Sequence, residues 1–129
     1  MDKVRAYERM VADIRRRLIA SVRRFLPRTI RVVEVSARES RRINRLYRGK
    51  NTPANALSFF YDSGYGEILV CPAVIRREAR MQKNSRAFQM TWMIAHGMLH
   101  LAGLHHEDSG RSARIVVRLE EHILSAIIK

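Results

Sequence analysis

The chain has 129 residues, of which 47% are hydrophobic and 29% charged, and its formal net charge is +13. This size and composition are typical of one globular domain, residues 1–129, and exclude a disordered or fibrous protein. Arginine and lysine run through the first 28 residues, and the most apolar stretch, residues 87–103, is too short to span a bilayer. We therefore expect no signal peptide and no membrane segment. The single cysteine, Cys71, excludes an internal disulfide and fits a reducing cytoplasm.

The positive charge is distributed unevenly along the chain. Residues 1–50 hold 16 basic and 5 acidic side chains, whereas residues 51–129 hold 9 and 7. The isoelectric point is about 11.3. A small domain this basic is expected to contact a polyanion, and nucleic acid is the commonest one.

The first half of the chain predicts a helix, a strand and a second helix. Apolar spacing over residues 3–26 is typical of one long amphipathic helix. Alternating β-branched residues over 30–35 predict a strand. Ser36 is a candidate N-cap with Glu39 three residues later, so a helix is expected over 37–48. The polar side of that helix carries five arginines: Arg38, Arg41, Arg42, Arg45 and Arg48.

The second half predicts two strands and three helices. The strands cover residues 56–61 and 65–71, joined by the hairpin-type turn Asp62-Ser63-Gly64. Pro72, Ser85 and Ser109 mark the starts of the three helices, which cover about 72–82, 85–102 and 110–128. This order predicts an α+β fold, in which about five helices pack on a small mixed β-sheet of three or four strands.

Four of the five histidines crowd into eleven positions between residues 96 and 106. His96 and His100 are four residues apart in an apolar run, so on a helix they lie on one face, one turn apart. Gly103 predicts the end of that helix, after which the chain can bring His105 or His106 back towards the same face. Two imidazoles from a helix and a third from the following turn predict a three-nitrogen metal site at the end of the central apolar helix.

Three imidazoles suit one zinc ion, although other divalent transition metals accept the same ligands. A fourth position left for water would let the metal activate that water. In the zincin motif H-E-x-x-H a glutamate follows the first histidine as general base, but position 97 is Gly, which argues against a protease. Glu107, beside the cluster, is a candidate for contacting a metal ligand or transferring a proton.

The histidine segment resembles a known family. Residues 96–106 read H-G-M-L-H-L-A-G-L-H-H and resemble the H-G-x-L-H-L-x-G-Y-D-H hallmark of the YbeY-type endoribonucleases, which are rRNA maturation factors. Residues 44–50, N-R-L-Y-R-G-K, are similar to the family's N-x-x-Y-R-G-K segment, and residues 56–59, A-L-S-F, to its V-L-S-F strand. Shorter matches occur at residues 66–68 and 120–124, so the resemblance covers about residues 40–129.

The resemblance implies a metal-dependent, single-strand-specific endoribonuclease that acts in maturation of the 16S rRNA 3′ end and in ribosome quality control. It implies His96, His100 and His106 as ligands of one Zn²⁺ ion. It also implies that Arg48 faces the catalytic cleft and stabilises charge on the phosphate. The implied partners are rRNA of the small ribosomal subunit and, as candidates, a ribosomal protein or a ribosome-associated GTPase. Three further basic residues are expected to contact RNA: Arg41, Arg45 and Lys50.

The chain also departs from the family pattern. Leu104-His105 stands where the family has Tyr-Asp, which makes His105 an alternative ligand to His106. The family's strand before the opening helix has no counterpart, so the sheet is expected to lack a strand or to pair with another chain, and the oligomeric state stays open. Two other functions also stay open: a non-catalytic rRNA-binding assembly factor with a structural metal, and a metal hydrolase of a substrate other than nucleic acid.

Overall fold

The structure is a computed structural model that describes residues 2–104 and 110–128. Apart from an additional short helix near the N-terminus, the helices and strands of the described residues follow the predicted order, and the α+β class is confirmed. The elements are α1 (Asp2–Arg17), α2 (Ala20–Arg23), β1 (Thr29–Glu34), α3 (Ala37–Arg48), β2 (Ala56–Asp62), β3 (Tyr65–Val70), α4 (Pro72–Gln82), α5 (Arg86–Leu101) and α6 (Gly110–Ile128).

The described part of the chain forms one three-stranded sheet in the order β1-β3-β2. Strand β1 runs parallel to β3, and β2 runs antiparallel to it, so the predicted mixed sheet is confirmed. The hairpin turn is closed by Asp62, whose Oδ1 accepts a hydrogen bond from the Gly64 amide at 2.7 Å. Because β3 lies in the centre, β1 and β2 are both edge strands, and each can present its outer backbone groups to a neighbour.

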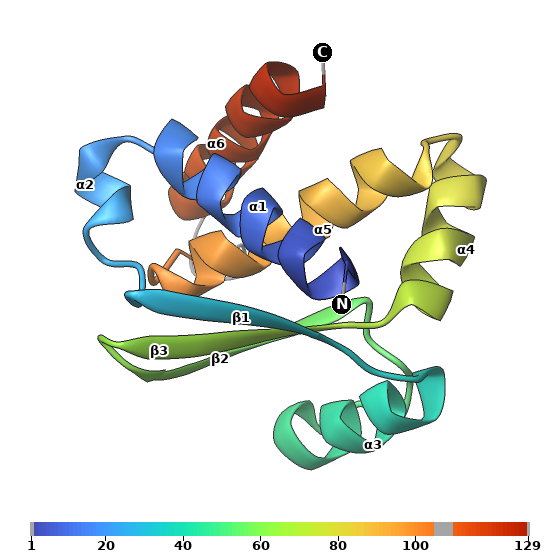
Figure 1. Cartoon of the computed structure of the whole chain (residues 1–129). Helices are drawn as coiled ribbons and strands as arrows, with labels where there is room; N and C mark the ends of the chain where they lie inside the picture. Colours follow the sequence, from blue (N-terminus) through green and yellow to red (C-terminus); the bar gives the residue numbers. More distant parts are fainter. Residues whose placement is uncertain (1, 105–109, 129) are drawn as a thin grey trace.

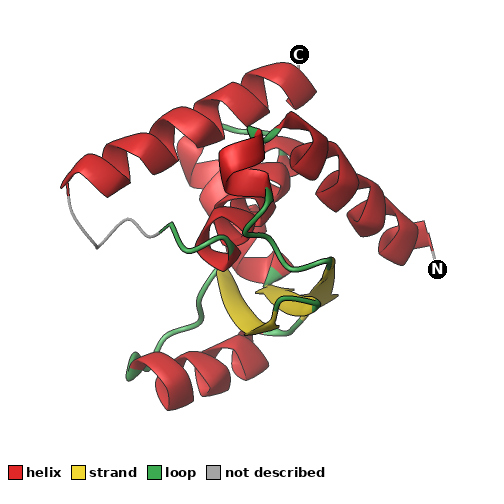
Figure 2. Cartoon of the chain, turned by 90° about the vertical axis from the view of Figure 1, so that its left-hand side faces the viewer, coloured by secondary structure: helices red, strands yellow, loops and turns green. Residues whose placement is uncertain are grey.

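The helices cover the two faces of the sheet unequally. Helices α1 and α5 lie over one face with α6 beyond them, while α3 lies on the opposite side (Figures 1 and 2). Helix α5 passes through the centre of the core, where Ile94, Met98 and Leu99 are fully buried. Burial of each such side chain contributes about 1.5–3 kcal/mol to stability. Although α5 is strongly apolar, no helix of the described residues is long and apolar enough to cross a membrane.

The predicted helix boundaries rest on visible caps. Ser36 Oγ accepts a hydrogen bond from the Glu39 amide at 3.1 Å, and Ser85 Oγ accepts one from the Phe88 amide at 3.1 Å. Gly103 follows α5 with a φ of +93°, which is the left-handed conformation that ends a helix. These caps explain why α3 and α5 begin where the sequence predicted, and why the chain turns shortly after Leu101, the last residue of α5.

The prediction of one helix over residues 3–26 is wrong. Helix α1 ends at Arg17, and Ile19 is extended with φ −63° and ψ 151° before the short helix α2. A straight helix to residue 26 would be roughly 36 Å long and would carry the chain past the sheet. The break instead lets both Leu18 and Leu26 enter the core, at 2% and 6% exposed. Arg15 stabilises the bend, because its Nη2 donates a hydrogen bond to the Pro27 carbonyl at 2.9 Å.

Candidate active site

Helix α5 presents two imidazoles side by side. The ring centroids of His96 and His100 are 4.3 Å apart, with 51° between the ring planes. Both side chains are partly exposed, whereas the residues between them, 97–99, are buried against the core. The predicted arrangement of the two histidines on one helical face, one turn apart, is therefore what the structure shows.

A buried carboxylate orients the first imidazole. His96 Nδ1 lies 2.5 Å from Glu120 Oε2, and Trp92 Nε1 donates to Glu120 Oε1 at 3.0 Å. Glu120 is only 4% exposed. A carboxylate at Nδ1 favours the tautomer that carries its proton there, which directs the lone pair to Nε2. This pairing is typical of a histidine prepared to bind a metal through Nε2.

The sequence analysis missed the role of Glu120, although its helix carried a signal. Val116 and Ile123 on α6 are fully buried, and Glu120 lies on the same helical face between them. A charged residue on a buried stripe is rarely tolerated unless it is paired. Its position therefore indicated a partner in the core, which the structure identifies as His96 together with Trp92.

The two histidines open into a hollow of about 480 Å³ between α3, β2 and α5, which we call the His–Arg hollow. Arg48 reaches it from the last turn of α3, which ends at Gly49 with a φ of +70°. Arg48, His96 and His100, predicted from separate parts of the sequence, thus line one hollow. Among the described residues, its lining is Tyr47, Arg48, Asn55, Ala56, Leu57, Ser58, Phe59, His96, Gly97 and His100.

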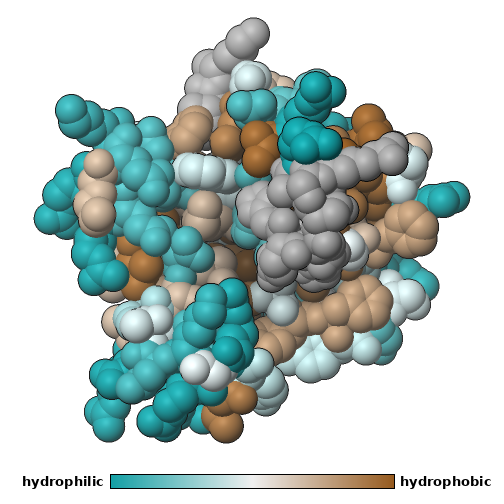
Figure 3. All heavy atoms as spheres, turned by 180° about the vertical axis from the view of Figure 1, so that it is seen from behind, coloured by the Kyte–Doolittle hydropathy of each residue, from teal (hydrophilic) through white to brown (hydrophobic). Residues whose placement is uncertain are grey.

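The other predicted RNA-contacting residues lie outside this hollow. Arg41, Arg45 and Lys50 are exposed on α3 and directly after it, and Arg41 Nε donates to Asn51 Oδ1 at 3.0 Å. Seen from behind, hydrophilic residues gather at the lower left of the molecule, where α3 lies (Figure 3). Arg41, Arg45 and Lys50 thus add positive charge to the exposed surface of α3 and do not form part of the wall of the His–Arg hollow.

Part of the predicted metal site cannot be compared with the structure. His105, His106 and Glu107 lie outside the described residues. Within residues 2–104 and 110–128, no three His, Cys, Asp or Glu side chains gather closely enough to hold a metal ion. The described chain thus supplies two neighbouring imidazoles and one supporting carboxylate, and the third ligand stays a prediction.

Strand β2 lines the His–Arg hollow with its outer edge. The Cys71 amide donates to the Asn55 carbonyl at 2.9 Å, and the register pairs Ala56 with Val70. In an antiparallel ladder the hydrogen-bonded pairs alternate, so the odd-numbered residues of β2 bond to β3. The backbone groups of Ala56 and Ser58 therefore point away from the sheet, where their N–H groups can donate to an anionic ligand.

Gly97 sets the distance between α5 and the sheet. Its carbonyl accepts a hydrogen bond from Ser58 Oγ at 3.1 Å. A Cβ added at position 97 would lie 2.9 Å from Ser58 Oγ and 3.0 Å from Ile68 Cγ2, closer than side chains normally approach. Position 97 therefore faces the sheet, and a glutamate there would meet β2 and β3. The absence of the zincin glutamate matches the way α5 packs.

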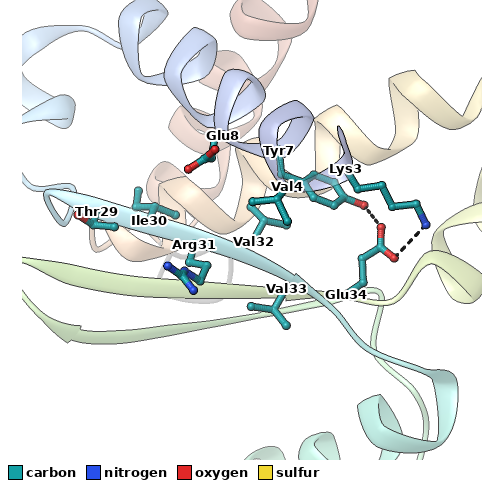
Figure 4. A pocket seen from close by; sticks show the side chains of 10 residues that line it. All are labelled: Lys3, Val4, Tyr7, Glu8, Thr29, Ile30, Arg31, Val32, Val33 and Glu34. Carbon is teal, nitrogen blue, oxygen red and sulfur yellow. Dashed lines mark hydrogen bonds and ion pairs between the residues drawn. The ribbon is translucent and has the colours of Figure 1, made fainter. Parts of the chain in front are cut away.

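A second hollow lies beside the outer edge of β1, under α1, and we call it the α1–β1 hollow (Figure 4). Its volume is about 440 Å³. Tyr7 donates its hydroxyl to Glu34 Oε2 at 2.5 Å, and Lys3 Nζ lies 3.5 Å from Glu34 Oε1. Burial, followed by the contact with Glu34, raises the pKa of the Tyr7 hydroxyl. None of the site residues predicted from sequence lines this hollow.

Comparison with known proteins identifies the family. The family described as "Endoribonuclease YbeY" matches residues 2–128. The chain belongs to the YbeY family. This membership supports an endoribonuclease role with RNA as substrate, and it confirms the resemblance that residues 96–106 carry.

Individual members of the YbeY family are also similar to this chain. An endoribonuclease YbeY from Aromatoleum aromaticum is 36% identical over 119 residues, which are 90% of this chain and 75% of that protein. The one from Halorhodospira halophila is 37% identical over 109 residues, or 77% of this chain and 69% of that protein. The solution structure of TM1509 from Thermotoga maritima is 26% identical, with a TM-score of 0.59 over 92% of this chain and 84% of that one.

Proposed function

We propose that this YbeY protein is a metal-dependent endoribonuclease that cleaves single-stranded RNA, acting in 16S rRNA 3′-end maturation and ribosome quality control. The observation that carries the proposal is the His–Arg hollow, which Arg48 lines together with two adjacent imidazoles. The guanidinium can bind a phosphate in the same space in which the imidazoles would hold a metal. A phosphodiester in this hollow would meet both groups at once.

The chemistry of the described donors fits a zinc ion. Histidines that bind zinc usually donate their second ring N–H to a carboxylate or a carbonyl, as His96 does to Glu120. His96, His100 and a third imidazole from His106, or from His105, would hold the ion, with Glu107 as a neighbour. When bound, zinc supplies Lewis-acid activation of a water or of a phosphate oxygen.

The protein's own groups would bind and orient the RNA. Arg48 neutralises the scissile phosphate and stabilises the charge that develops as the bond breaks. The outward N–H groups of Ala56 and Ser58 can donate to phosphate oxygens, as backbone amides often do in nucleic-acid complexes. On the exposed side of α3, a further group of cations would hold the neighbouring phosphates: Arg41, Arg45 and Lys50.

The surface charge supports a ribosomal substrate. A net charge of +13 on 129 residues favours association with densely charged rRNA in a salt-dependent manner. We infer a cytoplasmic protein that acts on the small subunit, with a ribosomal protein or a ribosome-associated GTPase as candidate partner. The alternatives are a non-catalytic rRNA-binding assembly factor and a metal hydrolase of a substrate other than nucleic acid, and the test below distinguishes the nuclease from the first of them.

The test is cleavage of a single-stranded RNA with the sequence of the 16S 3′ end, beside its duplex form. Zinc-loaded wild type should cut the single strand. Chelation, which removes the metal, and His100→Ala, which removes one of its proposed ligands, should each reduce cutting to background. The control is His122→Ala, at an exposed histidine of α6, which should cut like wild type. Undiminished cutting after both treatments would contradict metal dependence. Tight RNA binding without cutting by wild type would favour the assembly factor.

A further inference from the structure

A third hollow adjoins the His–Arg hollow on the far side of His100. It has a volume of about 440 Å³, and we call it the Phe25–Phe60 hollow. Ser58 and His100 line both hollows, so the two spaces meet at these residues. A ligand that occupies the His–Arg hollow can therefore continue into the third one. Its described lining is Phe25, Ser58, Phe60, His100, Leu101, Ala102 and Gly103.

Two phenylalanines in this hollow stay largely exposed. Phe25, which follows α2, and Phe60, on β2, are each 55% exposed. Single exposed apolar side chains are common and need no explanation, but two aromatic rings on one hollow are the kind of surface that a ligand covers. A phenylalanine has no polar atom, so the ring can offer only stacking and apolar contact.

Positive charge accompanies the rings. The guanidinium carbon of Arg24 lies 4.8 Å from the centroid of the Phe25 ring. This places a cation beside one wall of the Phe25–Phe60 hollow, while Arg48 lines the His–Arg hollow on the other side of His100. Each of the two adjoining hollows thus has a cation beside an aromatic ring, as a strand of alternating phosphates and bases requires.

We propose that the Phe25–Phe60 hollow binds a nucleobase of single-stranded RNA, which stacks on Phe60 and Phe25 beside the cleaved phosphate. The proposal rests on the proposed function, since it extends the same RNA strand across His100. A volume of about 440 Å³ is within the range of sites that hold small planar ligands. An apolar peptide is a poorer occupant because the hollow continues into a space lined by Arg48 and the imidazoles.

This base site gives a physical reason for a preference for single strands. A base in a duplex is stacked and paired, so it must be extruded before it can stack on a protein ring, which costs free energy. An unpaired base enters at a much lower cost. The aromatic wall would thus select unpaired RNA without reading its sequence, because every base has a stacking face.

The test measures binding of a fluorescent 2′-O-methyl oligonucleotide to the full chain at several salt concentrations. Phe60→Ala and Phe60→Leu should each weaken binding, by roughly fivefold or more, because stacking on the ring is lost. Phe60→Tyr keeps the ring and should bind nearly as wild type does. The loss should be similar at every salt concentration, whereas Arg24→Ala should flatten the salt dependence.

Tyr61→Ala is the matched control. Tyr61 is also an exposed aromatic residue of β2, at 59%, but its ring lies against Tyr65 and it lines neither hollow. This variant should bind RNA as wild type does. A 2-aminopurine base placed along the oligonucleotide should be quenched at one position by wild type, and less by Phe60→Leu.

Three outcomes would overturn the base site: wild-type affinity in Phe60→Leu, equal losses in Tyr61→Ala and Phe60→Ala, or no position of selective quenching. If Phe60→Ala unfolds, Phe25→Ala and Phe60→Leu answer the same question. Failure of the proposed function is distinguishable. If the wild type binds the oligonucleotide and quenches its base but never cuts RNA, the nuclease is refuted and the base site stands. If the wild type cuts RNA while Phe60→Ala and Phe60→Leu bind the oligonucleotide as tightly as it does, the base site is refuted and the nuclease stands.

Discussion

The two edges of one sheet offer hollows of similar size and different chemistry. Beside β1, the α1–β1 hollow measures about 440 Å³, and beside β2, the His–Arg hollow measures about 480 Å³. At β1, Glu34 accepts the hydrogen bond from Tyr7 and pairs with Lys3, so these three polar side chains contact one another (Figure 4). At β2, two imidazoles and a guanidinium face the same space.

The difference teaches that volume alone does not identify a site in this fold. Both hollows lie where an edge strand meets a helix, β1 with α1 in one case and β2 with α3 and α5 in the other. What separates them is the convergence of groups that can bind a metal or a phosphate, with a buried carboxylate orienting one of them. The comparison can be tested by changing equivalent groups at the two edges.

The largest expected effect contrasts two arginines. Arg48→Ala should lower the rate of RNA cleavage about 10²- to 10³-fold, because a charge-stabilising donor is removed from the transition state. Arg31→Ala, which removes an exposed arginine that lines the α1–β1 hollow, should leave the rate within about twofold of wild type. Single-turnover cleavage at saturating protein measures both. Equal losses in the two variants would mean that general basicity, and not the His–Arg hollow, sets the rate.

A smaller effect is expected at the carboxylate behind His96. Glu120→Gln keeps the shape of the side chain but removes its charge, so zinc affinity or activity should fall by about 10- to 100-fold. Competition with a metal-sensitive dye measures the affinity directly. Glu121→Gln, at the exposed neighbouring position of α6, serves as control. Unchanged zinc affinity in Glu120→Gln would show that this carboxylate supports only the fold.

The smallest effect belongs to the β1 edge. Tyr7→Phe removes the hydrogen bond to Glu34 and should lower the free energy of unfolding by about 1 kcal/mol, with cleavage unchanged. Because the folded-state pKa of Tyr7 is raised, its contribution is complete below the ordinary tyrosine pKa and is lost as the pH rises through the folded value. Urea denaturation should show that the free energies of unfolding of wild type and Tyr7→Phe differ at neutral pH and become similar at strongly alkaline pH. A constant difference would contradict this assignment.

Much of the fold could be predicted because its boundaries are local. Ser36, Ser85 and Gly103 act on residues within one turn of themselves, and the predicted caps are present. The break after Arg17 was missed because it depends on distant contacts. The apolar spacing continues across Leu18 and Ile19, and only the need to bring Leu26 and Pro27 back to the sheet ends the helix.

The same distinction holds for the site. His96 and His100 were predictable because four-residue spacing fixes a shared helical face. Arg48 came from the family resemblance, since one arginine among the five on α3 has no distinguishing local pattern. Glu120 and Trp92 meet His96 only through the packing of α6 on α5, which joins residues 24 and 28 positions apart. The third metal ligand stays a prediction that falls on residues 105–106.

The contact at Gly97 has a consequence for engineering. The imidazoles flank a residue that already touches Ser58 and Ile68, so the thickness of the helix–sheet interface sets how far they stand from Arg48. Enlarging a side chain on either of those strands would shift His96 and His100 relative to Arg48 without altering any of the three. Conversion of this scaffold into a peptidase would therefore require rebuilding the sheet beneath α5, because a glutamate inserted after His96 has no room on that side of the helix.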